Sequence, residues 1–367
     1  MSLHPKTRVS KRESVLIRAL RSFPFVLLIA FAFNRMDAEE AIKEVDEVIH
    51  SGILTWSGGS LPIYDSFFGI QWLDNLWRPV TVIFAAWNLE IDPVMWWQML
   101  TFVTDFGLIY SIMLIESTRT ANRLTLARVA TLVGLAAQLI GVGVVGPVYF
   151  FLHYVTSQIF NFEDPDQRLT NLAYTRTVFP VMVLSFYIPH FMSHFHPSFA
   201  ARHDWDWIWQ MFPVWCALIQ WILAYTVMPN TAQNGRMNEP KRDLQIIRFT
   251  IGPSIILSAV TWLGVLTMSP FSVRTIFLPH FTAPQHGWMD IVRNFGQYDH
   301  LFCMGSAMLW LLYLFGDLKR AGMVQRSWMS ILVAAAAATA VMGPGAAVGL
   351  GWFWRENVLA GMEGKSV

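Results

Sequence analysis

Apolar runs of about twenty residues recur along this chain, and they constrain its fold more than any other feature. An α-helix needs roughly 20 apolar residues to cross the hydrocarbon core of a bilayer. The composition agrees, with 54% hydrophobic and only 14% charged residues, as is typical of polytopic membrane proteins. The sequence therefore predicts an all-α transmembrane bundle of about eight spans, with residues 1–367 forming a single integral membrane domain. We expect the spans near 14–34, 94–116, 127–153, 177–196, 205–229, 246–268, 299–317 and 328–353.

Two segments depart from this pattern. Residues 67–87 are apolar but contain Asp74, Arg78 and Pro79, so a ninth span, a re-entrant piece and an interfacial helix all remain open. Residues 36–64 begin with an acidic, amphipathic stretch, which we expect to lie outside the bilayer.

Composition and motifs exclude several classes of function. A net charge of +1 gives no basis for nucleic-acid binding. The chain has neither a Walker A loop nor a dinucleotide-binding fingerprint. It also lacks the aspartate-rich clusters that hold magnesium and diphosphate. The sequence therefore predicts no metal and no cofactor.

Acidic residues within the apolar runs are the main candidates for chemistry. A charge in the hydrocarbon region costs about 3 kcal/mol or more, so an intramembrane carboxyl is a functional-site hypothesis by default. Asp105 lies deepest in a predicted span, and Asp299 lies near the start of another. Because burial disfavours the charged form, we expect Asp105 to be the proton donor and Asp299 to orient the substrate or accept the final proton. A structural contact for Asp105 and a capping role for Asp299 are the alternatives.

Glu116 is the third catalytic candidate. It is eleven residues after Asp105 and therefore on the same helical face. Arg119 follows three residues later, so an ion pair at the membrane edge is an equally good interpretation.

Aromatic and histidine side chains at helical spacing are candidates for substrate contacts. Tyr149 and His153 are four residues apart, and His153 could hydrogen-bond an acid. Tyr187, His190 and His194 form a second stripe. No carboxylate or cysteine accompanies this stripe at ligand spacing, so it argues only weakly for a metal.

The chain contains the motifs Glu116-Ser117-x-Arg119, Gly146–Tyr154, Arg168–Asn171, Tyr174-Thr175, Tyr187–Pro189, Trp209–Trp215 and Gln297–Asp299. Together they resemble fungal integral-membrane terpene cyclases of meroterpenoid biosynthesis, in particular the macrophorin, ascochlorin and ascofuranone type. They are spread over most of residues 94–316. The resemblance implies a metal-independent cyclase of the endoplasmic reticulum, whose proposed substrate-binding residues also include Gln210 and Trp215.

The resemblance implies that protonation of an epoxide or olefin starts cyclisation of a farnesyl chain on an aromatic or epoxyquinone head. Such chemistry needs a neutral acid in a dry pocket and aromatic faces that stabilise carbocations. We therefore expect Asp105, His153, Tyr187 and Asp299 to surround one cavity lined by Phe and Trp. A proton-coupled transporter, which should show broken helices in two repeated halves, and a non-catalytic membrane protein are the alternatives.

Overall fold

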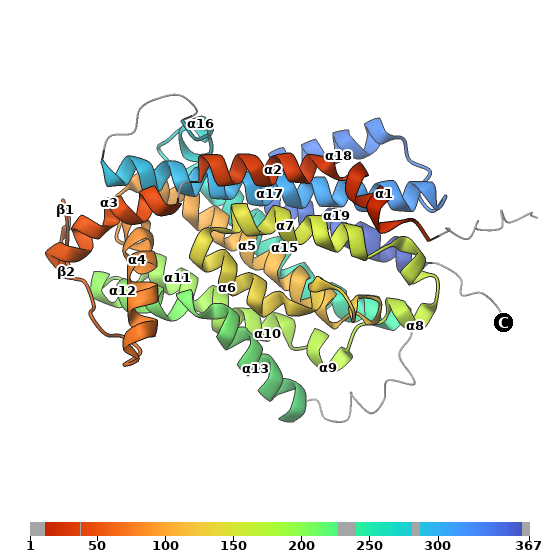
Figure 1. Ribbon diagram of the computed structural model, residues 1–367, viewed down its shortest axis with the longest axis horizontal. Coiled ribbons are helices and arrows are strands. Elements are labelled where there is room, and N and C mark those ends of the chain that lie inside the picture. The colour runs from red at the N-terminus through yellow and green to blue at the C-terminus, as the bar shows by residue number, and fades with distance from the viewer. Residues whose placement is uncertain (1–11, 37, 227–239, 281–286, 362–367) are drawn as a thin grey trace, which may run out of the picture.

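The computed structural model describes residues 12–36, 38–226, 240–280 and 287–361. It is built around one long helix, α5 (Pro93–Thr118), which crosses the middle of the bundle (Figure 1). Asp92 caps this helix by accepting hydrogen bonds from the backbone N–H groups of Val94 and Met95, and Pro93 occupies the first helical position. The helix is buried along nearly its whole length, which explains why its sequence is apolar on every face.

Helices from distant parts of the chain surround α5. Its main neighbours are α15 (Pro240–Met268) and α19 (Pro344–Ala360), while α17 (Trp288–Arg320) packs along α7 (Val142–Thr156) and α19. The other main helices are α1 (Val15–Arg21), α2 (Phe23–Arg35), α3 (Ala38–Ser51), α4 (Gln71–Asn88), α6 (Ala130–Ile140), α10 (Val178–Met182), α11 (Ile188–Phe195), α12 (Phe199–Gln210), α13 (Phe212–Thr226), α16 (Val273–Phe277) and α18 (Trp328–Met342); α8 (Pro165–Arg168) and α9 (Leu172–Thr175) are single turns.

Two of the segments that the sequence predicts as continuous spans are helices broken at a glycine. Residues 127–153 form α6 and α7, which meet at Gly141, and residues 328–353 form α18 and α19, which meet at Gly343. Both glycines have φ of 88°, a left-handed conformation that side chains other than glycine rarely adopt. Each junction therefore exposes the first N–H groups of a new helix in the interior of the bundle.

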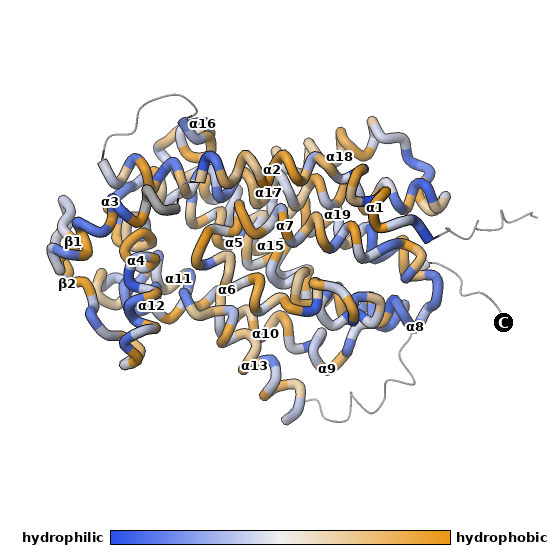
Figure 2. Tube along the Cα trace, in the orientation of Figure 1, coloured by the Kyte–Doolittle hydropathy of each residue, from blue (hydrophilic) through white to orange (hydrophobic). Residues whose placement is uncertain are grey.

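The all-helical class is confirmed, but the number of spans is lower by the criteria of length and hydropathy. In the described part of the chain, α5, α15, α17 and the segment Val178–Phe195 are long and apolar enough to cross a membrane. The bent pairs α1–α2 (57°) and α12–α13 (66°) raise this number from four to six. Figure 2 shows that the middle of the bundle is largely hydrophobic and that hydrophilic segments gather at both ends. The predicted span 205–229 extends past the described residues by three positions.

The two segments that depart from the pattern of apolar spans, residues 36–64 and 67–87, adopt distinct structures. Residues 36–64 contain α3 and a hairpin of β1 (Ile53–Trp56) and β2 (Gly59–Pro62), paired antiparallel. Residues 67–87 correspond to α4. Its Asp74 accepts hydrogen bonds from the Ser66 hydroxyl and the Phe68 N–H, at 2.8 Å each. Arg78 donates to the carbonyls of Tyr64 and Asp65, so both charges of this segment hold the loop before α4.

Candidate functional site

A cavity rich in aromatic side chains lies between α4, α5, α6 and α17, next to α3. Its empty space, counted with its open mouth, is about 730 Å³, and the centres of water-sized molecules can reach about 60 Å³ of it. Asp299 is its one carboxyl among the described lining residues. The lining residues are Ile42, Val80, Ile83, Phe84, Trp87, Met99, Phe102, Val103, Phe106, Ala137, Gln138, Leu139, Gly141, Val142, Trp209, Phe295 and Asp299.

Asp299 connects this cavity to the first helix break. Its Oδ1 accepts a hydrogen bond from the N–H of Gly143, the second residue of α7. Two glycines make the close approach possible, because a Cβ at Gly141 would lie 3.0 Å from Asp299 Oδ1 and a Cβ at Gly143 would lie 2.9 Å from the Asp299 backbone. Oδ2 has no hydrogen-bond or ion-pair partner within the described residues. One carboxyl oxygen of this cavity-lining residue is therefore fixed, and the other has no partner within the described residues.

Asp105 lies at the second helix break and does not line the aromatic cavity. Its Oδ2 accepts from the N–H of Gly345, the second residue of α19, at 2.9 Å, and its Oδ1 accepts from the Ser258 hydroxyl at 2.5 Å. A Cβ at Gly345 would lie only 2.3 Å from Asp105 Cγ. Both carboxyl oxygens are therefore occupied, as in the structural contact that the sequence left open.

Glu116 belongs to a buried charge network at the other end of α5. Its carboxylate forms ion pairs with Arg119 at 3.1 Å and Arg355 at 3.0 Å. Arg119 also pairs with Glu356 at 2.7 Å. Two arginines and several hydrogen-bond donors hold Glu116 in the ionised form, so the structure agrees with the ion-pair interpretation.

His153 faces this network and does not line the aromatic cavity. Its Nε2 is 3.6 Å from Glu116 Oε2, and its Nδ1 accepts a hydrogen bond from the Trp310 indole at 3.1 Å. Because Nδ1 accepts, a neutral His153 has its proton on Nε2, toward Glu116. The acid next to His153 is thus Glu116, at a separation that is longer than the predicted hydrogen bond.

The two candidate tyrosines lie at different surfaces of the bundle core. Tyr149 lines a small cavity next to the aromatic cavity, and Phe106, Ala137 and Val142 line both cavities. Tyr187 ends a π-helical stretch and lines an apolar groove between α11 and α15. The expected convergence of Asp105, His153, Tyr187 and Asp299 on one cavity is therefore wrong, since only Asp299 lines it.

The histidine stripe and Trp215 of α13 do not line the aromatic cavity and form contacts within the bundle. His190 contacts the Thr104 hydroxyl at 3.2 Å, and the backbone carbonyl of His190 contacts His194 Nδ1 at 3.1 Å. The half-buried Trp215 donates to the Ile208 carbonyl. Within the part of the chain that the structure describes, no three His, Cys, Asp or Glu side chains group in a way that could hold a metal ion.

Sequence reasoning missed a polar chain beside the cavity. Asp206 is 1% exposed and accepts from Gln210 Nε2 at 2.9 Å, and Gln210 in turn accepts from Gln138 Nε2 at 3.2 Å. Tryptophans that flank Asp206 suggest an interfacial belt, but Trp207 and Trp209 are buried, and Trp209 lines the cavity. The i, i+4 spacing of Asp206 and Gln210 was the signal available in the sequence.

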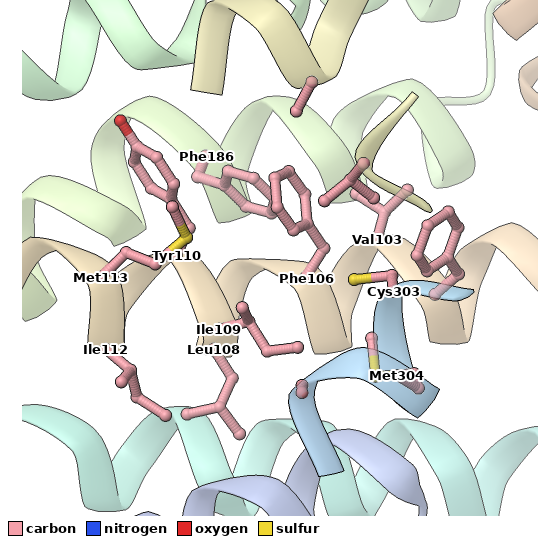
Figure 3. Packing of buried hydrophobic residues seen from close by; sticks show 14 of the residues in the cluster. Val103, Phe106, Leu108, Ile109, Tyr110, Ile112, Met113, Phe186, Cys303 and Met304 are labelled. Carbon is pink, nitrogen blue, oxygen red and sulfur yellow. The ribbon is translucent and has the colours of Figure 1, made fainter. Parts of the chain in front are cut away.

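Aromatic rings continue from the cavity into the core around α5. Figure 3 shows Phe106 and Tyr110 of α5 on the side of Phe186, with Cys303 of α17 near Phe106 and Val103. The rings of Phe106 and Phe186 are 6.1 Å apart, centroid to centroid, and meet edge to face. Such packing places aromatic faces and edges, rather than polar groups, around the cavity.

Comparisons with known proteins agree with an enzyme family. The profile of the CtvD domain matches residues 20–360. The terpene cyclase ctvD of Aspergillus terreus is 25% identical over 252 residues, which are 65% of this chain and 70% of that protein. No solved structure matches this chain.

Two relatives with higher sequence identity to this chain are named as monooxygenases and are longer than the chain. The FAD-dependent monooxygenase verC1 of Penicillium polonicum is 35% identical over 98% of this chain, and anuJ of Penicillium roqueforti, also named an FAD-dependent monooxygenase, is 29% identical over 98%. The match covers only 45% and 43% of those two proteins. This chain thus spans less than half the length of these relatives.

Proposed function

We propose that this chain, which belongs to the CtvD domain family, is an integral-membrane terpene cyclase that closes rings in the prenyl chain of a meroterpenoid. The observation that carries the proposal is the cavity in which Asp299 is accompanied almost entirely by aromatic and aliphatic side chains. A prenyl chain is apolar, and the carbocations formed during its cyclisation are stabilised by ring faces, at about 2 kcal/mol for a desolvated contact. The name of the ctvD relative supports the same reaction class.

Asp299 is the proposed proton donor, in place of Asp105. In the described residues neither carboxyl forms an ion pair with a cation, and apolar surroundings favour the neutral form of such a group. The two differ in access, because both oxygens of Asp105 are bound while Asp299 keeps Oδ2 free. Asp105 then has a positioning role at the start of α19.

The proposed reaction is an isomerisation. The Asp299 carboxyl transfers its proton to the epoxide oxygen, or to a carbon of the terminal olefin, and the strained C–O bond or the π bond breaks. Neighbouring olefins supply the electron pairs that form the new C–C bonds. Loss of a proton from the last carbocation restores the proton count, so substrate and product have the same mass. The N–H of Gly143 would stabilise the carboxylate left on Asp299.

Flavin chemistry does not fit the residues of this chain. A dinucleotide site needs a glycine-rich turn between a strand and a helix of a parallel sheet. Among the residues that the structure describes, the sheet consists of the two antiparallel strands β1 and β2, and the sequence has no such fingerprint. We infer that the FAD-dependent activity named for verC1 and anuJ belongs to the more than half of each protein that lies outside the match.

A proton-coupled transporter is the second candidate, favoured by the two helix breaks. Broken helices near the middle of a bundle are a feature of transporters, and α6–α7 and α18–α19 both provide one. In transporters the exposed helix ends face the substrate, whereas here Asp299 and Asp105 occupy them. This difference favours the cyclase.

The mass of the product separates these functions. Protein in nanodiscs is incubated with farnesylated phenols and with their terminal epoxides, without added flavin or reductant. The cyclase proposal predicts a product of unchanged mass that has fewer double bonds. A product heavier by one oxygen atom, formed only with flavin and reductant, would instead indicate a monooxygenase. Recovery of unchanged substrates, with uptake by sealed vesicles, would indicate a transporter.

A further inference from the structure

The aromatic cavity has a polar subsite on the side away from α17, formed by Gln138 of α6. Gln138 is 8% exposed and lines the cavity. Its Nε2 is directed at Gln210, 3.2 Å from Oε1 and 3.4 Å from the backbone oxygen. Its Oε1 has no partner among the described residues. The Gln138 amide therefore offers its acceptor oxygen to the cavity.

Asp206 determines this orientation through Gln210. Asp206 Oδ1 accepts from Gln210 Nε2 at 2.9 Å, as a carboxylate oxygen does, and as a neutral carboxyl does when its proton is on Oδ2. In this arrangement Gln210 presents its Oε1 to Gln138, and Gln138 uses its NH₂ group toward this oxygen and toward the Gln210 backbone carbonyl. Asp206 and Gln210 are almost completely buried, at 1% and 0% exposure, so water does not compete for these bonds. A reversed Gln138 would place two amide oxygens against each other.

We propose that Gln138 binds a hydroxyl group on the head of the substrate, which donates a hydrogen bond to Oε1. The ligand class is a prenylated phenol or hydroquinone, and a quinone carbonyl or a methyl ether would find no donor there. This inference rests on the proposed function, because it assigns the head group of the same substrate. It places the head at α6 and α12 and the reacting end of the prenyl chain at Asp299.

The alternative is that the three side chains only join α6 to α12. In that case the Gln138 oxygen would have no ligand, and head-group chemistry would not affect binding. The chain provides a matched control in Gln220 of α13, a helical amide that is 6% exposed and donates to the Tyr174 carbonyl at 3.2 Å. Gln220 does not line the aromatic cavity.

Binding of two unreactive ligands tests the subsite. One is a phenol with a fully saturated farnesyl chain, and the other is its methyl ether. Equilibrium dialysis between protein-containing and empty nanodiscs corrects for partition into lipid. We expect the wild type to bind the phenol roughly threefold to tenfold more tightly than the ether, the effect of one hydrogen bond. Equal affinities in the wild type would overturn the proposal without any variant.

Variants then assign the preference to the chain of three residues. In Gln138→Met the ratio of the affinity for the phenol to that for the ether should fall to about one. A purely steric preference for the smaller phenol would instead remain after this substitution. Gln220→Met should keep the wild-type ratio. Asp206→Leu should reduce the ratio and Asp206→Asn should restore it, since an amide oxygen still accepts from Gln210. An unchanged ratio in Gln138→Met would contradict the subsite.

The binding and turnover results separate the two proposals. A phenol preference that depends on Gln138, with no isomerisation of the unsaturated substrate, would support the proposed subsite and contradict the proposed cyclase activity. Isomerisation together with equal binding of phenol and ether would support the proposed cyclase activity and contradict the proposed subsite.

Discussion

The junctions at Gly141 and at Gly343 share one construction. In each, a left-handed glycine with φ of 88° separates two apolar helices, and an aspartate from another long helix accepts the N–H of the second residue of the new helix. They differ in what surrounds the aspartate. Asp105 has a donor on each oxygen and does not line the aromatic cavity, whereas Asp299 has one donor and lines that cavity. The same capping motif thus occupies both carboxyl oxygens at one junction and leaves one oxygen without a partner at the other, among the described residues.

The largest expected difference between the junctions is in turnover. Asp299→Asn should lower turnover by about 100- to 10,000-fold, because the amide keeps the volume of the side chain but cannot deliver a proton. Asp105→Asn should retain turnover within about tenfold, since its role is to hold α19. Initial rates in nanodiscs, with folding checked by size-exclusion chromatography, measure both. Normal turnover in Asp299→Asn together with loss in Asp105→Asn would reverse the assignment.

The next difference is in stability, and it concerns the tighter junction. Gly345→Ala places a Cβ 2.3 Å from Asp105 Cγ, so we expect it to lower the free energy of unfolding by about 1–3 kcal/mol, as overpacking does. Gly146→Ala in α7 is the control, because its Cβ would have no neighbour closer than 3.5 Å, and it should change stability by about 1 kcal/mol or less. Thermal unfolding in one detergent compares the two. Equal stability of both variants would show that the Asp105 junction is loosely packed.

Hydropathy predicted the helical class and the approximate positions of the apolar segments, because burial in lipid or protein demands long apolar helices. It did not predict the breaks at Gly141 and Gly343. Gly141-Val142-Gly143 and Gly343-Pro344-Gly345 are the local signals, but a glycine within an apolar run is equally compatible with close helix packing. Only the approach of an aspartate from another helix shows which interpretation holds.

The candidate site was predictable in its residue types and less so in its geometry. Depth within a span favoured Asp105 as the acid, yet depth does not show whether a carboxyl is occupied by donors. The ion pair of Glu116 with Arg119 could be anticipated from their spacing, whereas Arg355, more than 200 residues away, could not. Asp206 was overlooked because its helix is rich in tryptophan, which also occurs at membrane interfaces.

Labelling with a hydrophobic carbodiimide tests most directly the claim that Asp299, and not Asp105, presents a free carboxyl to the cavity. Such reagents enter apolar sites and react with protonated carboxyl groups. After treatment in nanodiscs and proteolysis, mass spectrometry should find the adduct on Asp299, with less adduct when the saturated prenylated phenol is present. Asp105 and Glu116 should remain unmodified, because donors and arginines occupy their oxygens. An adduct on Asp105 with Asp299 unmodified would contradict the account.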